Sequence, residues 1–122
     1  MTITTGGNLT IVNFDKTSKD TFNSSFTTSG SNFVSDTITI NTSSWFTIPT
    51  GSNVDFLTGQ FTNNDLNNKV YIALGTTNNI VSILSPLAPT CLLAYSGSVQ
   101  SFAHTSGSNA TSSFAYTLVS MN

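Results

Sequence analysis

Apolar and polar residues alternate along most of this 122-residue chain. In the segment KVYIALG, Val70, Ile72 and Leu74 fall on one side of an extended chain, while Tyr71 and Ala73 fall on the other. A repeat of two residues is that of a β-strand. Segments with this pattern, or with many β-branched and aromatic residues, predict short strands. They cover residues 8 to 14, 33 to 41, 45 to 48, 54 to 62, 69 to 75, 80 to 85, 90 to 96, 98 to 104 and 113 to 119.

Gly, Asn and Pro fill the segments between these strands, as they do in turns. Strong helix formers are rare, so we expect at most a helical turn, near Leu66. The pentapeptide TSGSN occurs at 28 to 32 and again at 105 to 109. The second copy lies between segments 98 to 104 and 112 to 119, and it therefore predicts a hairpin loop that joins two paired strands.

Several short antiparallel strands with polar turns pack most simply as two sheets around one layer of core. The sequence therefore predicts an all-β fold in a single domain, residues 1 to 122. We expect an antiparallel, jelly-roll-like β-sandwich of about eight to nine short strands. Large aromatic side chains are expected to fill its core. They are Phe14, Phe33, Trp45, Phe56, Phe61, Tyr71, Tyr95, Phe102, Phe114 and Tyr116.

Residues 16 to 31 form the least strand-like stretch of the chain. Phe22 and Phe26 are its only large apolar residues. One interpretation is a long surface loop. The other is an arm that docks on a neighbouring subunit and buries both rings there, since long loops in compact domains are often functional. Phe22 and Phe26 are therefore candidate interaction residues.

The chain is polar but almost uncharged. Charged residues make up 7% of it, whereas Thr, Ser and Asn number 21, 19 and 14. It has no Arg and only three Lys, so it lacks the basic patch that binding to phosphate backbones requires. We therefore expect no direct contact with nucleic acid. Low net charge favours self-association, because little repulsion keeps copies apart.

The N-terminal segment MTITTGGNLT does not have the basic and apolar regions of a signal peptide. No apolar run approaches the roughly 20 residues of a membrane helix, so we expect no membrane partner. Cys91 is the single cysteine, which excludes an intrachain disulfide and agrees with folding in a reducing cytoplasm. Without basic neighbours in sequence, it is interpreted as a small buried apolar residue rather than a reactive thiol.

Candidate catalytic and metal-binding groups are few. His104 is the only histidine, and no GxSxG motif accompanies it. The five Asp residues lie in or near predicted loops and strand edges, where solvated turn residues are common. Asp65 with nearby Asn side chains offers oxygen ligands for calcium, but too little charge for a strong site. We therefore predict no enzymatic activity, no metal and no cofactor.

Trp45 suggests an alternative function. Lectin sites on β-sandwiches combine an exposed aromatic ring with polar loop residues, and Trp45 follows Asn41, Ser43 and Ser44. An exposed Trp45 would favour carbohydrate binding, whereas a buried ring would be a core residue at the start of a strand. Trp45 is therefore a third candidate interaction residue.

The segment VYIALGTTNNIVSILSPLAPTCLLAYSGSVQSFAHTSGSNATSSFAYTLVS combines strands, Gly, Asn and Pro turns, and few charges. In this style, residues 54 to 120 resemble the small all-β structural proteins of tailed-bacteriophage virions, particularly capsid cement or decoration proteins. The resemblance implies a virion protein, made in the host cytoplasm, that binds and stabilises the capsid shell. Its expected partners are the major capsid protein or other virion proteins, and further copies of itself in a dimer or trimer. A tail or neck location stays open.

Overall fold

The computed structural model describes residues 2–13, 15–27, 33–49, 55–96, 98–106 and 110–121. The chain divides into two compact units, Met1–Ser31 and Asn32–Asn122. All regular structure in the described residues is β-strand, ten strands in total, which confirms the predicted all-β class. The helical turn expected near Leu66 is absent from the described residues, which form bends there.

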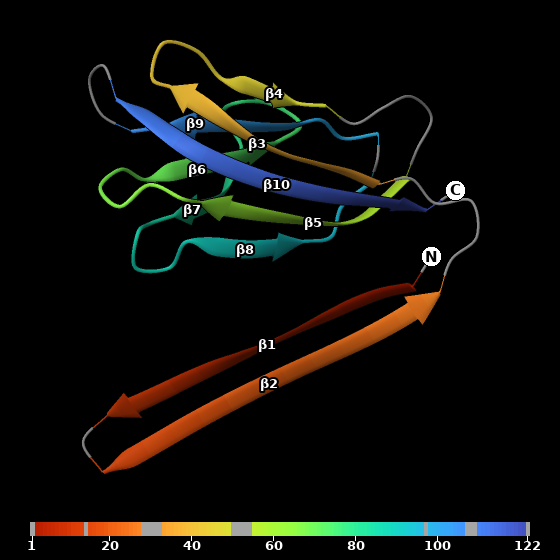
Figure 1. Ribbon diagram of the computed structural model, residues 1–122, viewed down its shortest axis with the longest axis vertical. Coiled ribbons are helices and arrows are strands. Elements are labelled where there is room, and N and C mark those ends of the chain that lie inside the picture. Colours follow the sequence, from red (N-terminus) through yellow and green to blue (C-terminus); the bar gives the residue numbers. More distant parts are fainter. Residues whose placement is uncertain are drawn as a thin grey trace. The chain divides into compact units, whose positions relative to one another are not determined.

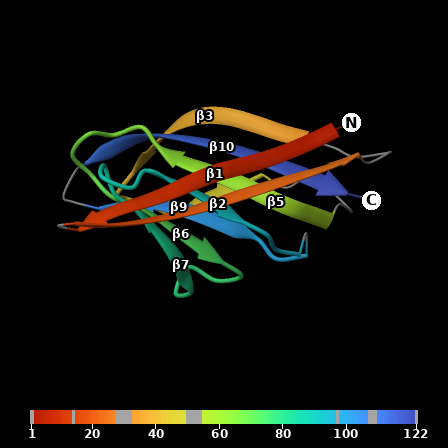
Figure 2. The ribbon, with the colours of Figure 1, turned by 90° about the horizontal axis from the view of Figure 1, so that it is seen from below.

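The first unit is a hairpin of two long antiparallel strands, β1 (Thr2–Asn13) and β2 (Lys16–Thr27) (Figures 1 and 2). Its register runs from the pair Thr2 and Thr27 to the pair Asn13 and Lys16. The expectation of a loop is therefore wrong for Lys16–Thr27. Thr is β-branched and suits an extended backbone, so a strand can form without an apolar alternation when a partner strand supplies the hydrogen bonds.

The second unit is a sandwich of two four-stranded antiparallel sheets (Figure 1). Sheet I has the strand order β3-β10-β5-β8, and sheet II has the order β4-β9-β6-β7. The strands are β3 (Phe33–Asn41), β4 (Phe46–Ile48), β5 (Asp55–Asn63), β6 (Val70–Leu74), β7 (Ile80–Leu84), β8 (Thr90–Leu93), β9 (Ser101–Thr105) and β10 (Thr111–Met121).

The strand pairs of the sandwich are nested. Strand β6 pairs with β7, β5 with β8, β4 with β9 and β3 with β10. This is the pairing of one long hairpin, which is rolled up so that its strands divide between two sheets. The further pairs β5 with β10 and β6 with β9 complete the sheets. Eight strands with this arrangement make a jelly roll, so the predicted β-sandwich is confirmed.

The expected pairing of segments 98 to 104 and 112 to 119 is wrong. Strand β9 belongs to sheet II and β10 to sheet I, so their connection crosses between sheets. A hydrogen bond of 2.6 Å joins the buried hydroxyl groups of Thr105 and Ser112 across the two sheets, next to this connection. Gly107 to Asn109, within the repeated TSGSN, lie outside the described residues, as does the copy at 28 to 32.

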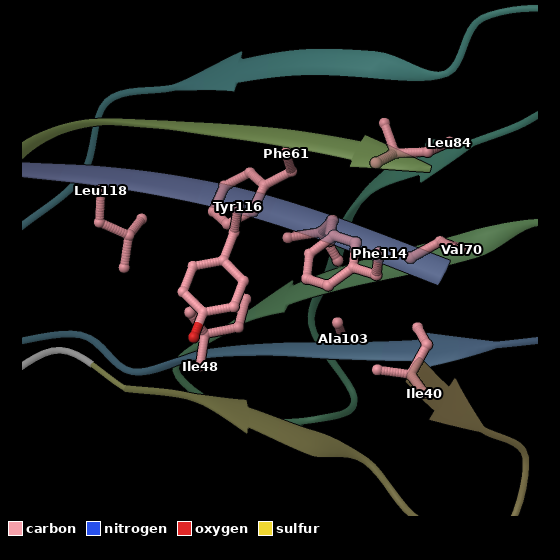
Figure 3. Packing of buried hydrophobic residues seen from close by; sticks show 10 residues of the cluster. Ile40, Ile48, Phe61, Val70, Leu84, Ala103, Phe114, Tyr116 and Leu118 are labelled. Atoms are coloured by element: carbon pink, nitrogen blue, oxygen red, sulfur yellow. The ribbon is translucent and has the colours of Figure 1, made fainter. Parts of the chain in front are cut away.

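The core lies between the two sheets (Figure 3). Phe61 and Phe114 are fully buried, and their ring centroids are 6.1 Å apart with nearly parallel planes. Figure 3 shows Tyr116 reaching from β10 towards Ile48 of β4. These positions confirm three of the expected core aromatics, and Tyr95 packs against the same cluster. The side chains of Phe14, Phe33 and Phe56 lie outside the described part.

Candidate interaction surface

The central strands of sheet II show which of its side chains point away from the core. Ser101, Ala103 and Thr105 of β9 are buried, whereas the alternating Phe102 and His104 are half-buried. Because successive side chains of a strand point to opposite faces, Phe102 and His104 lie on the outer face of this sheet. The strand register extends this assignment to the neighbouring strands.

Two rows of side chains cross this outer face. In one row, Tyr71 of β6 lies between His104 and Ile83 of β7. In the other, Ala73 lies between Phe102 and Ile80, and Phe102 also pairs with Thr47 of β4. We call this surface the aromatic face. It consists of Trp45, Thr47, Tyr71, Ala73, Ile80, Ile83, Phe102 and His104.

Trp45 joins the aromatic face through His104. The two rings are stacked, with centroids 4.8 Å apart, and His104 Nε2 lies 3.2 Å from the carbonyl oxygen of Thr42. Trp45 is half-buried. Its burial is therefore intermediate between the exposed ring expected of a sugar-binding site and the buried ring expected of a core residue. These contacts give His104 a structural role, in which it fixes the indole ring and the β3–β4 loop.

The aromatic face is separate from the core. In the described part of the chain, Trp45, Tyr71 and Phe102 belong neither to the core cluster nor to the residues packed against it. The prediction that these three residues belong to the core is therefore wrong. They lie on the opposite side of sheet II, away from the core. The side chains of Ile80 and Ile83 are 47% and 55% exposed.

The outer face of sheet I is different in chemistry. We call it the polar face, and its residues are Ser35, Thr37, Thr39, Gln60, Thr62, Thr90, Leu92, Ser113, Ala115 and Thr117. Hydroxyl groups pair across its strands, Ser35 with Thr117 at 2.9 Å and Thr62 with Thr90 at 3.3 Å. A shallow groove crosses it, with Thr37, Gln60 and Thr117 in its lining. This is the ordinary polar outside of a sandwich, and it makes the aromatic face of sheet II unusual.

Phe22 and Phe26, the other candidate interaction residues, lie in β2 of the hairpin. Their backbones pair with Gly7 and Ile3 of β1. Their side chains fall outside what the structure describes, so their predicted docking role stays a prediction. The structure describes Phe22 and Phe26 in a different unit from Trp45.

The loop around Asp65 is held by internal hydrogen bonds. Asp65 Oδ1 accepts the backbone N–H groups of Asn67 and Asn68, at 2.7 and 2.8 Å, and these bonds lower the pKa of the Asp65 carboxyl group. Asn63 is buried, and its Nδ2 donates to the carbonyl oxygens of Asn68 and Leu84. The described residues contain no cluster of three or more His, Cys, Asp or Glu side chains around a common point.

Cys91 is half-buried and packs against the core cluster from β8. Burial raises the pKa of its thiol, and a hydrogen bond with Ser82 partly opposes this shift. A raised pKa keeps the group as a thiol at neutral pH, and the thiolate is the reactive form. The arrangement agrees with the interpretation of Cys91 as a small apolar residue.

Sequence reasoning did not identify the aromatic face as a surface. A signal for it was present, because both alternating sets of residues in VYIAL are apolar. In a strand with one side in water, one of the two sets should be polar. The pattern thus indicates that both sides of β6 avoid water.

Comparison with known proteins identified no relative of this chain. No protein-family model matches the chain, and no curated protein matches it. Among the described residues, no helix is long and apolar enough to span a membrane.

Proposed function

We propose that this chain is a non-enzymatic virion structural protein, and specifically a cement or decoration protein that binds a bacteriophage capsid shell and stabilises it. The observation that carries the proposal is the aromatic face on the outside of sheet II. A sandwich needs apolar residues only on the inner faces of its sheets. A second apolar face is useful when another protein covers it.

The energetics support an adhesive role. Covering apolar surface stabilises an assembly by about 25 cal/mol per Å². Tyr71 and Phe102 are of the residue types that dominate protein interfaces. The chain has a net charge of only −2, so copies held close together on a shell repel one another weakly.

The hairpin offers a second means of attachment. Strands β1 and β2 form a two-stranded sheet, so each has one neighbour and one open edge within the described residues. Open edges can add to a sheet of another protein through backbone hydrogen bonds.

The reason for proposing a virion, rather than another kind of assembly, is the resemblance in style to tailed-phage structural proteins. Jelly rolls occur in viral capsid and lectin domains, and the fold alone does not fix a function. The resemblance in style therefore supports the location, while the aromatic face and the open hairpin edges support the mechanism.

The test is binding to capsid shells prepared without this chain. We expect the purified protein to co-sediment with the shells and to saturate at a fixed number of copies per shell. Loaded shells should withstand a higher temperature than bare shells, because a ligand that binds the assembled state stabilises it. If the protein stays in the supernatant at every concentration, the proposal is wrong.

Carbohydrate binding is the second candidate, because Trp45 is half-buried at the edge of the aromatic face rather than inside the core. One ring face of Trp45 is stacked on His104, so a sugar would have to bind the other face. A glycan array probed with the purified chain distinguishes the two functions. Specific, saturable glycan binding without binding to shells would favour the lectin-like module.

A further inference from the structure

We infer that the aromatic face binds the same face of a second copy of this chain, in a two-fold symmetric dimer. The inference deepens the proposed function, on which it rests for the setting of an assembly. It names the surface through which copies meet, and it leaves the open edges of the β1–β2 hairpin for attachment to the shell. It is derived from the composition, size and symmetry of the face.

The composition of the aromatic face favours an apolar, uncharged partner. None of its eight positions is Asp, Glu, Lys or Arg, so it offers no charge for an oppositely charged protein or nucleic acid to recognise. A second aromatic face has the matching properties. The polar face of the same molecule does not, because it would leave its hydroxyl groups opposite aliphatic and aromatic side chains.

The size of the face agrees with a weak dimer. Strand β4 has three residues, and β6, β7 and β9 have five each. With spacings of about 4.8 Å between strands and about 3.4 Å between residues, the outline of the face is roughly 300 Å². Two such faces give roughly 600 Å² in total, below the roughly 1,000 Å² of a stable interface and in the range of weak, transient contacts. We therefore expect a dissociation constant of roughly 100 μM in solution, and fuller association where a shell concentrates the copies.

The symmetry of the face suits two-fold pairing. The order of sheet II puts β9 and β6 at its centre and β4 and β7 at its edges. Phe102 and Tyr71 lie on the central strands, so a two-fold axis through the middle of the face brings them to the centre of the interface. Buried aromatic residues at the centre of an interface commonly contribute most of its binding energy. The isoleucines of β7 lie nearer the rim.

Two other parts of the surface are weaker candidates for a binding site than the aromatic face. The groove on the polar face is open and lined mainly by hydroxyl-bearing residues, and Asp36 and the buried Tyr116 also contribute to its lining. Leu66 and Leu87 are 86% and 98% exposed on loops. They are single side chains on separate loops and do not form a continuous face.

The dimer is tested by sedimentation equilibrium from about 1 μM to 1 mM, a range that brackets the expected affinity. Ile83→Lys introduces a charge on the exposed part of the face, which dimerisation would bring against an apolar surface. Because this position lies nearer the rim, we expect it to weaken self-association by roughly tenfold. Ile80→Lys provides a second, independent variant of the same face.

Leu92→Lys is the matched control. Leu92 is an aliphatic residue on β8, an edge strand of sheet I, and is 38% exposed on the polar face. This variant should self-associate like the original chain. Far-ultraviolet circular dichroism and thermal unfolding of all three variants identify any that fails to fold, so that a folding defect is not scored as lost association.

The single tryptophan gives an independent readout. Trp45 lies at the edge of the face, so dimerisation should remove water from its ring and shift its fluorescence to shorter wavelengths as the concentration rises. The shift should be absent in Ile83→Lys and present in Leu92→Lys. A monomer at every concentration overturns the inference, as does equal self-association of the three variants and the original chain.

The outcome is separable from that of the shell-binding test. A chain that binds shells but remains monomeric in solution and in fluorescence contradicts the dimer and leaves the proposed function standing. A chain that dimerises through the aromatic face but does not bind shells contradicts the proposed function and supports the interface.

Discussion

Asn63 connects several loops at one end of the sandwich. Its side-chain nitrogen donates to Asn68 and Leu84, its side-chain oxygen accepts the backbone N–H of Asp65, and its own backbone N–H donates to Pro89. The side chain is 3% exposed. A buried amide with all its partners satisfied fixes the position of surrounding backbone.

Replacement of this side chain should therefore be costly. We expect Asn63→Ala to lower the free energy of unfolding by about 2–3 kcal/mol, because the buried carbonyl group of Leu84 loses its hydrogen-bond donor. Urea denaturation measures the change. The adjacent Asn64→Ala is the control, since Asn64 is exposed and donates its backbone N–H, which the substitution keeps, to the carbonyl oxygen of Ser113. Its effect should stay within about 0.5 kcal/mol. Similar losses in both variants would refute this role of Asn63.

At the scale of the element, strand β5 contains a close approach at Gly59. A Cβ atom on Gly59 would lie 2.7 Å from Leu118 Cδ2 and 2.9 Å from Phe61 Cζ. Leu118 and Phe61 are both fully buried, so neither can move freely. The missing side chain thus allows the ring of Phe61 to cover the backbone of its own strand.

This packing predicts that Gly59→Ala is destabilising, although alanine favours an ordered backbone more than glycine does. Overpacking of a tight core should lower the free energy of unfolding by about 1–3 kcal/mol, as measured by chemical denaturation. Ser113→Ala, an exposed change on the neighbouring β10, should be within about 0.5 kcal/mol of the original chain. An unchanged or increased stability of Gly59→Ala would contradict the packing described here.

The elements also show what could be predicted from the sequence. Strands with one apolar side, such as β3, were placed correctly because alternation reports directly on the backbone. Strand β2 was missed because its Thr and Ser residues give no alternation. The predicted pairing of β9 with β10 was wrong because neighbours in sequence usually pair, whereas in this jelly roll the chain crosses from sheet II to sheet I between β9 and β10. Only the folded topology contains that information.

Of the residues on the aromatic face, the sequence pointed only to Trp45 as a candidate interaction residue, and that role stays a prediction. The structure places Trp45 at the edge of this face, stacked on His104. Tyr71 and Phe102 were assigned to the core. Alternation shows which residues share a side of a strand, but it does not show which side meets the core when both are apolar.

At the scale of the whole molecule, the sandwich has two outer faces of opposite character. The polar face can remain in water, whereas the aromatic face gains stability when it is covered. A jelly roll with an apolar outer face and little net charge is suited to work in an assembly. We propose that, in the working state of this protein, another protein chain covers the aromatic face.

Hydroxyl-radical footprinting of the free and shell-bound protein tests this claim most directly. The dilute, free chain should be oxidised at Trp45, Tyr71 and Phe102, and the shell-bound chain should be protected at all three. Leu92, on the polar face, serves as the internal reference and should be modified equally in both. Equal oxidation of the three aromatic rings in the free and bound states would contradict the account.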